Sequence, residues 1–215
     1  MRCDLPPVRF LYWILKRCLI PRLRKWGVSP TNLTVAGLVF CVLAGLAYLV
    51  SPLWAAMLAI IGGLCDATDG LLARTLDATS SRGAFLDSVL DRYGESCLML
   101  GIWAYLSRFP AYGTIGTIAV LTALIGAFMV SYTRARGEGL AISFKRGLFT
   151  REERLVLIIL GSLLDALAPG MILLVTILVL AVGANLTAIH RLMGISAQLS
   201  AADHSPLSPG NQGET

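Results

Sequence analysis

Residues 26–65, WGVSPTNLTVAGLVFCVLAGLAYLVSPLWAAMLAIIGGLC, form a run of 40 consecutive residues without a charged side chain. A helix needs about 20 such residues to cross the hydrocarbon core of a bilayer. The Ser51-Pro52 pair in the middle of the run predicts a turn. The stretch therefore predicts two membrane-spanning helices, over about residues 32–50 and 53–73.

The composition of the whole chain agrees with a membrane location. Of its 215 residues, 56% are hydrophobic and only 14% are charged, and the mean hydropathy is +0.72. Soluble domains carry about a quarter charged residues, so the composition argues against a water-soluble fold. Because backbone groups in lipid must form their hydrogen bonds within the chain, the prediction is an all-α integral membrane protein.

Further apolar stretches raise the predicted number of spans to six. Runs of 25 uncharged residues lie at 109–133 and 166–190. The fifth span is short, but Thr150 and Glu153 match a capping box at its start. Its 18 residues would extend roughly 27 Å. The last four spans are expected over about 84–107, 111–133, 151–168 and 171–190.

The segments outside the spans complete the expected organisation. Residues 7–26 mix apolar and basic side chains, which predicts an amphipathic helix on the membrane surface, kinked at Pro21. We therefore expect an N-terminal amphipathic segment over 1–31 and a six-span membrane domain over 32–195. The tail, 196–215, is rich in Ser, Pro, Gly and Asn and is predicted to be disordered.

The basic residues predict the orientation of these spans. With six spans, every Lys and Arg except Arg108 falls on one side of the membrane. By the positive-inside rule that side is cytoplasmic, so both termini are expected in the cytoplasm. If the chain is prokaryotic, the membrane is expected to be the cell membrane. The net charge of +5 therefore does not require a nucleic-acid partner.

Four aspartates stand near the cytoplasmic ends of two predicted spans. Asp66 and Asp69 close the second span, and Asp87 and Asp91 open the third. Spacings of three and four place each pair on one helical face. A charge at membrane depth costs at least about 2.5 kcal/mol, so the cluster predicts compensating Mg²⁺ or Mn²⁺. Two such ions about 4 Å apart would also hold a phosphate group during a displacement reaction.

Small residues beside these aspartates favour a nucleotide ligand over a bare ion. Gly70 and Ala73 lie four and seven positions after Asp66, so that helical face is almost without side chains. A flat ligand can therefore approach the backbone. Gly83 stands four residues before Asp87, so the facing helix also lacks a side chain beside its aspartates. Arg74 is expected to contact a phosphate or a base.

The complete pattern is Asp66-x2-Asp69-Gly70-x2-Ala73-Arg74-x8-Gly83-x3-Asp87-x3-Asp91. It resembles the signature of the CDP-alcohol phosphotransferases, DxxDGxxAR followed by GxxxDxxxD. The resemblance extends over most of residues 7–192, including the run SPTNLTVAGL at 29–38. There this chain departs from the PNxLT common in the family, because its Asn32 is shifted by one position.

The resemblance implies transfer of a substituted phosphate from a CDP-linked donor, usually CDP-diacylglycerol, to an alcohol, with release of CMP. It also implies a homodimer surrounded by membrane lipids. By the same resemblance Asp91 would act as the catalytic base. The implied metal ligands are Asp66, Asp69, Asp87 and Asp91, and the implied donor contacts are Asp66, Asp69, Gly70, Ala73, Arg74, Thr75 and Gly83.

Three arginines are candidates for binding the acceptor alcohol. Arg134, Arg154 and Arg191 are expected at the same membrane surface as the aspartates, where they would bind an anionic, phosphorylated alcohol. The alternative is that they are ordinary interfacial anchors. Residues 131–136 and 151–155 resemble the segments of family members that use inositol phosphate, which favours that acceptor.

Other acceptors and another class of function remain open at this point. Glycerol phosphate, as in phosphatidylglycerol phosphate synthases, is the main alternative acceptor, and serine or unphosphorylated inositol is less favoured. A cation channel or carrier could also use four carboxylates. Such a path should carry acidic or polar residues across the bilayer, whereas Asp165 is the only acid predicted on the opposite side.

Overall fold

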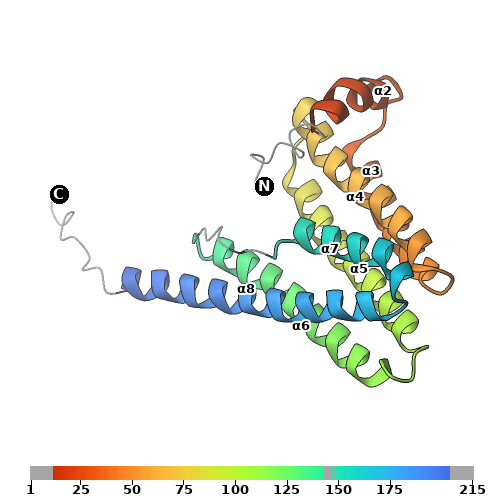
Figure 1. Cartoon of the computed structure of the whole chain (residues 1–215). Coiled ribbons are helices and arrows are strands. Elements are labelled where there is room, and N and C mark those ends of the chain that lie inside the picture. Colours follow the sequence, from red (N-terminus) through yellow and green to blue (C-terminus); the bar gives the residue numbers. More distant parts are fainter. Residues whose placement is uncertain (1–11, 143–146, 148, 204–215) are drawn as a thin grey trace, which may run out of the picture.

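The computed structural model describes residues 12–142, 147 and 149–203, and this part of the chain is helical with no strand (Figure 1). The expected all-α class is therefore confirmed. Residues 1–11 of the predicted N-terminal segment and 204–215 of the predicted tail lie outside the described residues. The elements are η1 (Leu15–Leu19), α2 (Ile20–Lys25), α3 (Pro30–Ala47), α4 (Pro52–Thr75), α5 (Ser81–Leu106), α6 (Gly113–Gly139), α7 (Arg151–Leu164), η2 (Asp165–Leu167) and α8 (Met171–Asp203).

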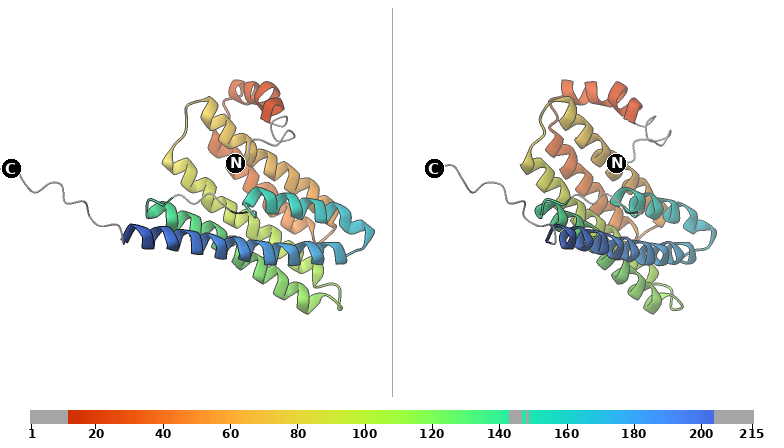
Figure 2. Two further views of the ribbon diagram at one scale, coloured as in Figure 1. Left: turned by 60° about the vertical axis from the view of Figure 1, so that its left-hand side comes forward. Right: turned by 90° about the vertical axis from the view of Figure 1, so that its left-hand side faces the viewer.

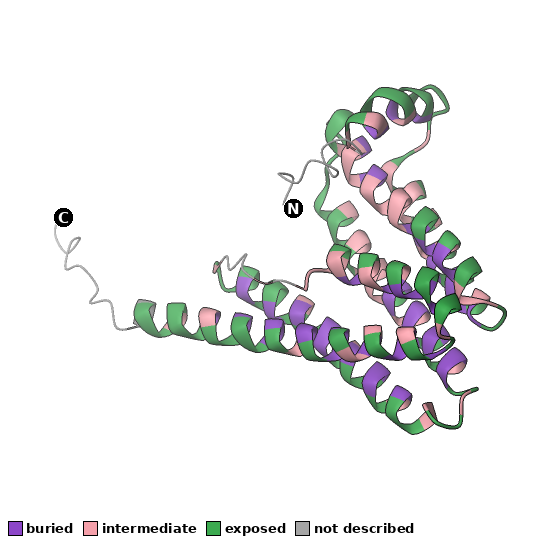
Figure 3. Ribbon diagram, viewed as in Figure 1, coloured by how far each residue is buried: buried purple, intermediate pink, exposed green. Residues whose placement is uncertain are grey.

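Four of these helices, α3, α4, α6 and α8, are long and apolar enough to cross a membrane. They correspond to the first, second, fourth and sixth predicted spans. The outer faces of the bundle carry large exposed apolar side chains, among them Ile118 of α6 and Val182 of α8, whose exposed fractions are 60% and 61%. Figure 3 shows the buried residues between the helices and the exposed ones on the outside. The chain is an integral membrane protein, because exposing so much apolar surface to water would be energetically unfavourable.

Serine and proline residues determine where several helices begin. The side chains of Ser29, Ser51 and Ser80 accept hydrogen bonds from backbone N–H groups in the first turns of α3, α4 and α5. Pro30 and Pro52 follow as first helical residues, where a missing N–H costs nothing. The predicted capping box at the start of α7 is confirmed.

The helices associate in two groups, which are connected through α7 and through a contact between α5 and α6. Helix α3 packs against both α4 and α5, and α6 packs against α8, while α7 contacts α4 and α8 (Figure 2). The backbones of α3 and α5 come close at Gly45 and Gly101. This packing places the carboxyl end of α4 beside the amino end of α5, which brings the four aspartates together.

The N-terminal segment is helical from residue 12 to residue 25. The irregularity expected at Pro21 takes the form of a π turn, η1, immediately before it. A π turn is a usual way for a helix to accommodate a break in its hydrogen bonds. Ile20 and Leu23 are buried together with Leu72 of α4, so the segment is fixed to the bundle beside the aspartates.

The predicted tail needs one correction. Residues 196–203, which we expected to be disordered, continue α8 to Asp203. The reason is local, because the sequence SAQLSAAD contains good helix formers and no proline or glycine. The Ser, Pro and Gly residues that suggested disorder are concentrated after residue 203.

Replacing Gly101 by alanine should destabilise the fold. A Cβ there would overlap the backbone of Gly45 on α3, so α3 and α5 must separate at a cost of about 1 to 3 kcal/mol. A Cβ at Gly113 meets nothing within 4 Å, so Gly113→Ala is the matched control. Thermal unfolding in detergent should show a lowered Tm for Gly101→Ala only. Equal Tm values for both variants would contradict the packing.

Candidate active site

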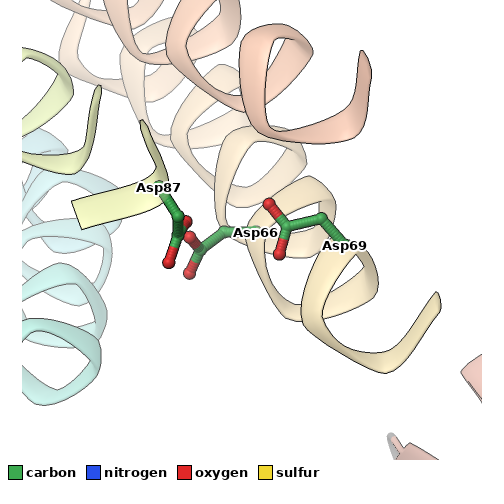
Figure 4. A group of neighbouring side chains, drawn as sticks. All are labelled: Asp66, Asp69 and Asp87. Atoms are coloured by element: carbon green, nitrogen blue, oxygen red, sulfur yellow. The ribbon is translucent and has the colours of Figure 1, made fainter. Parts of the chain in front are cut away.

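Three carboxylates form the centre of the site. One oxygen from each of Asp66, Asp69 and Asp87 lies within 4.8 Å of the other two. Asp66 and Asp69 come from the last turns of α4, and Asp87 comes from the second turn of α5 (Figure 4). Asp69 is buried, and the other two are half-buried. The structure thus brings together three of the four predicted metal ligands.

The site has the properties of a divalent cation site. Oδ1 of Asp87 is buried and has no hydrogen-bond partner among the described residues. A buried oxygen without a partner is costly, and three like charges at this separation repel one another. Carboxylate oxygens are ligands that Mg²⁺ and Mn²⁺ prefer. One cation bound by the three aspartates would remove both costs, so these residues fit such an ion.

Asp91 lies one turn further along α5 and has a different partner. Its Oδ1 is 2.8 Å from Nη2 of Arg151, the first residue of α7. Nη1 of the same guanidinium is 2.6 Å from Oδ2 of Asp66. Asp91 therefore belongs to the site but not to the group of three, and Arg151 connects it to Asp66.

Two residues of the site were missed by the sequence analysis. Arg151 is one, although its position just after the recognised cap residue Thr150 was a usable signal. Thr34 is the other, and its hydroxyl donates a 2.7 Å hydrogen bond to Oδ2 of Asp69. Thr34 belongs to the SPTNLT run that the sequence analysis noted. In the same run the backbone N–H of Asn32 donates to the cap hydroxyl of Ser29.

The predicted donor contacts lie along the end of α4 and the start of α5. A Cβ at Gly70 would have Arg74 Nη2 as its nearest neighbour, at 3.6 Å, so the backbone there is open. Arg74 and Thr75 are exposed, and the Thr75 hydroxyl donates to the Leu71 carbonyl. The remaining two residues, Ala73 and Gly83, are partly exposed. The strip of small side chains next to the carboxylates is therefore accessible.

The three predicted acceptor arginines lie on three different helices and have different surroundings. Arg154 of α7 is buried, and its Nε and Nη2 donate to the two carboxylate oxygens of Glu95 at 2.7 and 2.8 Å. Arg191 of α8 is buried and donates to the Val130 carbonyl. Arg134 of α6 is exposed and pairs with Glu138. Arg154 is tied directly to α5, because its partner Glu95 lies on that helix four residues after Asp91.

These features define a helical membrane protein with a carboxylate cluster suited to a divalent cation and an open backbone strip beside it. The model of the CDP-alcohol phosphatidyltransferase family matches residues 28–183. The chain belongs to this family. Membership confirms the resemblance and the expected reaction class of a metal-dependent lipid transferase, and the channel or carrier alternative is set aside.

Two named relatives are similar to this chain over most of its length. An archaetidylinositol phosphate synthase of Pyrococcus horikoshii is 35% identical over 157 residues, covering 70% of this chain and 78% of the relative. The enzyme of the same name from Methanothermobacter thermautotrophicus is 32% identical over 188 residues, covering 86% and 92%.

Solved structures of one Mycobacterium tuberculosis protein, a phosphatidylinositol phosphate synthase, share the fold. The structure with CDP-DAG bound has a TM-score of 0.75 and 23% identity, covering 96% of this chain and 100% of that one. The structure with manganese and citrate has a TM-score of 0.75 and 24% identity, covering 91% and 92%.

Removing the carboxylate of Glu95 should destabilise the protein strongly. Glu95→Ala leaves the buried Arg154 without its partner, which costs about 3 to 5 kcal/mol. Glu138→Ala breaks the exposed pair with Arg134 and should cost at most about 1 kcal/mol. Thermal unfolding of the two variants in the same detergent tests this. A Glu95→Ala variant that melts with the wild type would show that the pair does not hold Arg154.

Proposed function

We propose that the chain is a phosphatidylinositol phosphate synthase or its archaeal-lipid counterpart, which transfers the phosphatidyl-type group of a CDP-lipid to an inositol phosphate. The observation that carries the proposal is the cluster of Asp66, Asp69 and Asp87 with Asp91 one turn beyond it. The names of the relatives support the acceptor, and the CDP-DAG and manganese in the related structures support the donor and the cation.

The proposed reaction assigns a task to each group of residues. Asp66, Asp69 and Asp87, with Asp91 at the edge, would hold Mg²⁺ or Mn²⁺, expected as two ions. Bound there, the ions would neutralise the pyrophosphate and stabilise the leaving CMP. Gly70, Ala73, Arg74, Thr75 and Gly83 would contact the cytidine and its phosphates.

Asp91 is the proposed base. The hydroxyl oxygen of the acceptor forms a bond to the phosphorus that carries the lipid, and the bond from that phosphorus to the oxygen of CMP breaks. The proton of the hydroxyl passes to the Asp91 carboxylate. Arg134, Arg154 and Arg191 would hold the phosphate of the acceptor, since guanidinium groups match phosphate oxygens in pairs. Arg154 would do so by exchanging a hydrogen bond to Glu95 or to the Phe149 carbonyl for one to the phosphate.

We also propose that α5 and α7 complete six spans within a catalytic domain over 32–195. The charged residues of α5 end at Glu95, and those of α7 end at Arg154, which leaves uncharged segments toward the other membrane surface. Helix α7 with η2 covers 17 residues, or roughly 25 Å. The positive-inside rule supports a cytoplasmic site. The segment over 12–25 would lie on the membrane surface, and a homodimer follows from the family resemblance.

The function is tested by a panel of acceptors offered with CDP-diacylglycerol or with a CDP-linked archaeal lipid, and with Mg²⁺ or Mn²⁺, while CMP is measured. We expect CMP release with inositol phosphate and little with glycerol phosphate, inositol or serine. CMP release with glycerol phosphate instead would reassign the acceptor, and no metal-dependent CMP release with any alcohol would reject the proposed reaction.

Within this assay, two substitutions should separate the roles of the aspartates. Asp69→Asn should abolish turnover and weaken binding of the metal and the CDP-lipid, because it removes a ligand. Asp91→Asn should abolish turnover but retain most of the CDP-lipid affinity, because a base acts mainly in the transition state. Equal loss of CDP-lipid binding in both variants would make Asp91 another ligand rather than the base.

The arginines are tested with polar replacements, and the two buried residues, Arg154 and Arg191, keep their positive charge. Arg134→Gln, Arg154→Lys and Arg191→Lys should each raise the KM for inositol phosphate about tenfold or more, because a charged hydrogen bond contributes about 1.5 to 3 kcal/mol. The KM for the donor should change little. Arg136→Gln, on the exposed end of α6, is the control. Unchanged kinetics in all three variants would leave the arginines as interfacial anchors.

A further inference from the structure

The positively charged side chain of Arg151 lies inside the candidate metal site. Its guanidinium lies between two predicted metal ligands, 2.6 Å from Asp66 and 2.8 Å from Asp91. The side chain is largely enclosed, with an exposed fraction of 18%. Its Nη1 and Nη2 contact different carboxylates, so Arg151 bridges the two helices α4 and α5 as a metal ion would.

The backbone fixes the point from which this side chain starts. Arg151 is the first residue of α7, and the helix start is set by the reciprocal cap between Thr150 and Glu153. The backbone N–H of Thr150 donates to Glu153 Oε2 at 2.8 Å. Helix α7 packs on α4. The guanidinium therefore reaches the aspartates from a firmly held helix end rather than from a loose loop.

The space around the guanidinium is small. A cavity of about 10 Å³ adjoins it, which holds about one water molecule. Its lining combines the two carboxylates, Arg151 and parts of α3 and α5, namely Thr34, Gly37, Leu38, Cys41, Asp66, Leu90, Asp91, Gly94 and Arg151. A cation with its remaining water ligands does not fit into this cavity beside the guanidinium.

The two possible cation positions are therefore unequal. The group formed by Asp66, Asp69 and Asp87 includes an oxygen of Asp87 without a hydrogen-bond partner among the described residues, and one member of the group, Asp66, is paired with Arg151. The position between Asp66 and Asp91 already contains the positive charge of Arg151, in close ion pairs with both carboxylates. An ion that enters the second position has to displace Arg151 from both carboxylates, whereas an ion that enters the first shares one carboxylate, that of Asp66, with Arg151.

We propose that Arg151 holds the position of a second divalent cation, so that one ion binds readily at Asp66, Asp69 and Asp87 and a second binds only by displacing Arg151 from Asp66 and Asp91. The inference rests on the proposed function for the identity of the metal site. It makes Arg151 a positioning residue, which keeps Asp91 beside the first ion without making it a ligand of that ion.

The test is a Mn²⁺ titration of the full-length protein in detergent, with free Mn²⁺ measured by electron paramagnetic resonance. Wild type should bind one ion tightly and a second at least about tenfold more weakly. In Arg151→Gln the second dissociation constant should fall about tenfold or more. The double variant Arg151→Gln with Asp91→Asn should lose this gain, because the second position then lacks a carboxylate.

Two controls separate displacement of the bridge from the general effect of charge. Arg151→Lys keeps the charge, but a single ammonium lacks the planar fork that joins two carboxylates, so its second ion should also bind more tightly than in wild type. Arg136→Gln removes an exposed charge from the end of α6 and should titrate like wild type.

The outcomes distinguish failure of the inference from failure of the proposed function. Identical titrations of wild type and Arg151→Gln would overturn the inference while leaving a metal site. The inference would also be overturned if the second Mn²⁺ bound more tightly to Arg151→Gln but bound to Arg151→Lys as it does to wild type, because the loss of charge alone would then explain the result. Tighter binding of the second Mn²⁺ to Arg136→Gln would overturn the inference for the same reason. Absence of Mn²⁺ binding in every variant would reject the metal site itself.

Discussion

Mutual repulsion among carboxylates at the end of a helical membrane bundle is the constraint on which the rest of this structure depends. Asp66, Asp69 and Asp87 are close enough to share one cation, and each negative charge removed from water is costly unless it is paired. Neighbouring groups meet part of this cost. Thr34 donates to Asp69, and Arg151 contacts Asp66 and Asp91. Oδ1 of Asp87 has no hydrogen-bond partner among the described residues, and a bound metal ion would offset the remaining cost.

Close helix packing is what allows the carboxylates to meet. Glycines at the contact between α3 and α5 let the backbones approach, and the capped start of α5 directs Asp87 toward the end of α4. Behind the aspartates, the buried pair of Glu95 and Arg154 joins α5 to α7. The same helix contacts that stabilise the bundle therefore also hold the site in place, which is expected of a reaction that depends on positioning.

Much of this arrangement could be predicted from the sequence, because it depends on short-range patterns. Uncharged runs and proline positions located α3 and α4 within a few residues, and spacings of three and four placed each aspartate pair on one face. The partners of the charged groups could not be predicted in the same way. The pairs of Arg151 with Asp91 and of Arg154 with Glu95 join residues far apart in sequence, so they depend on how the helices pack.

The central claim is that Asp66, Asp69 and Asp87 bind the cation that the proposed transfer requires. The most direct measurement is the anomalous diffraction of crystals grown with Mn²⁺. An anomalous peak is expected in contact with carboxylate oxygens of all three aspartates. A peak bound elsewhere, or no peak at these residues in crystals that hold Mn²⁺ at other sites, would contradict it.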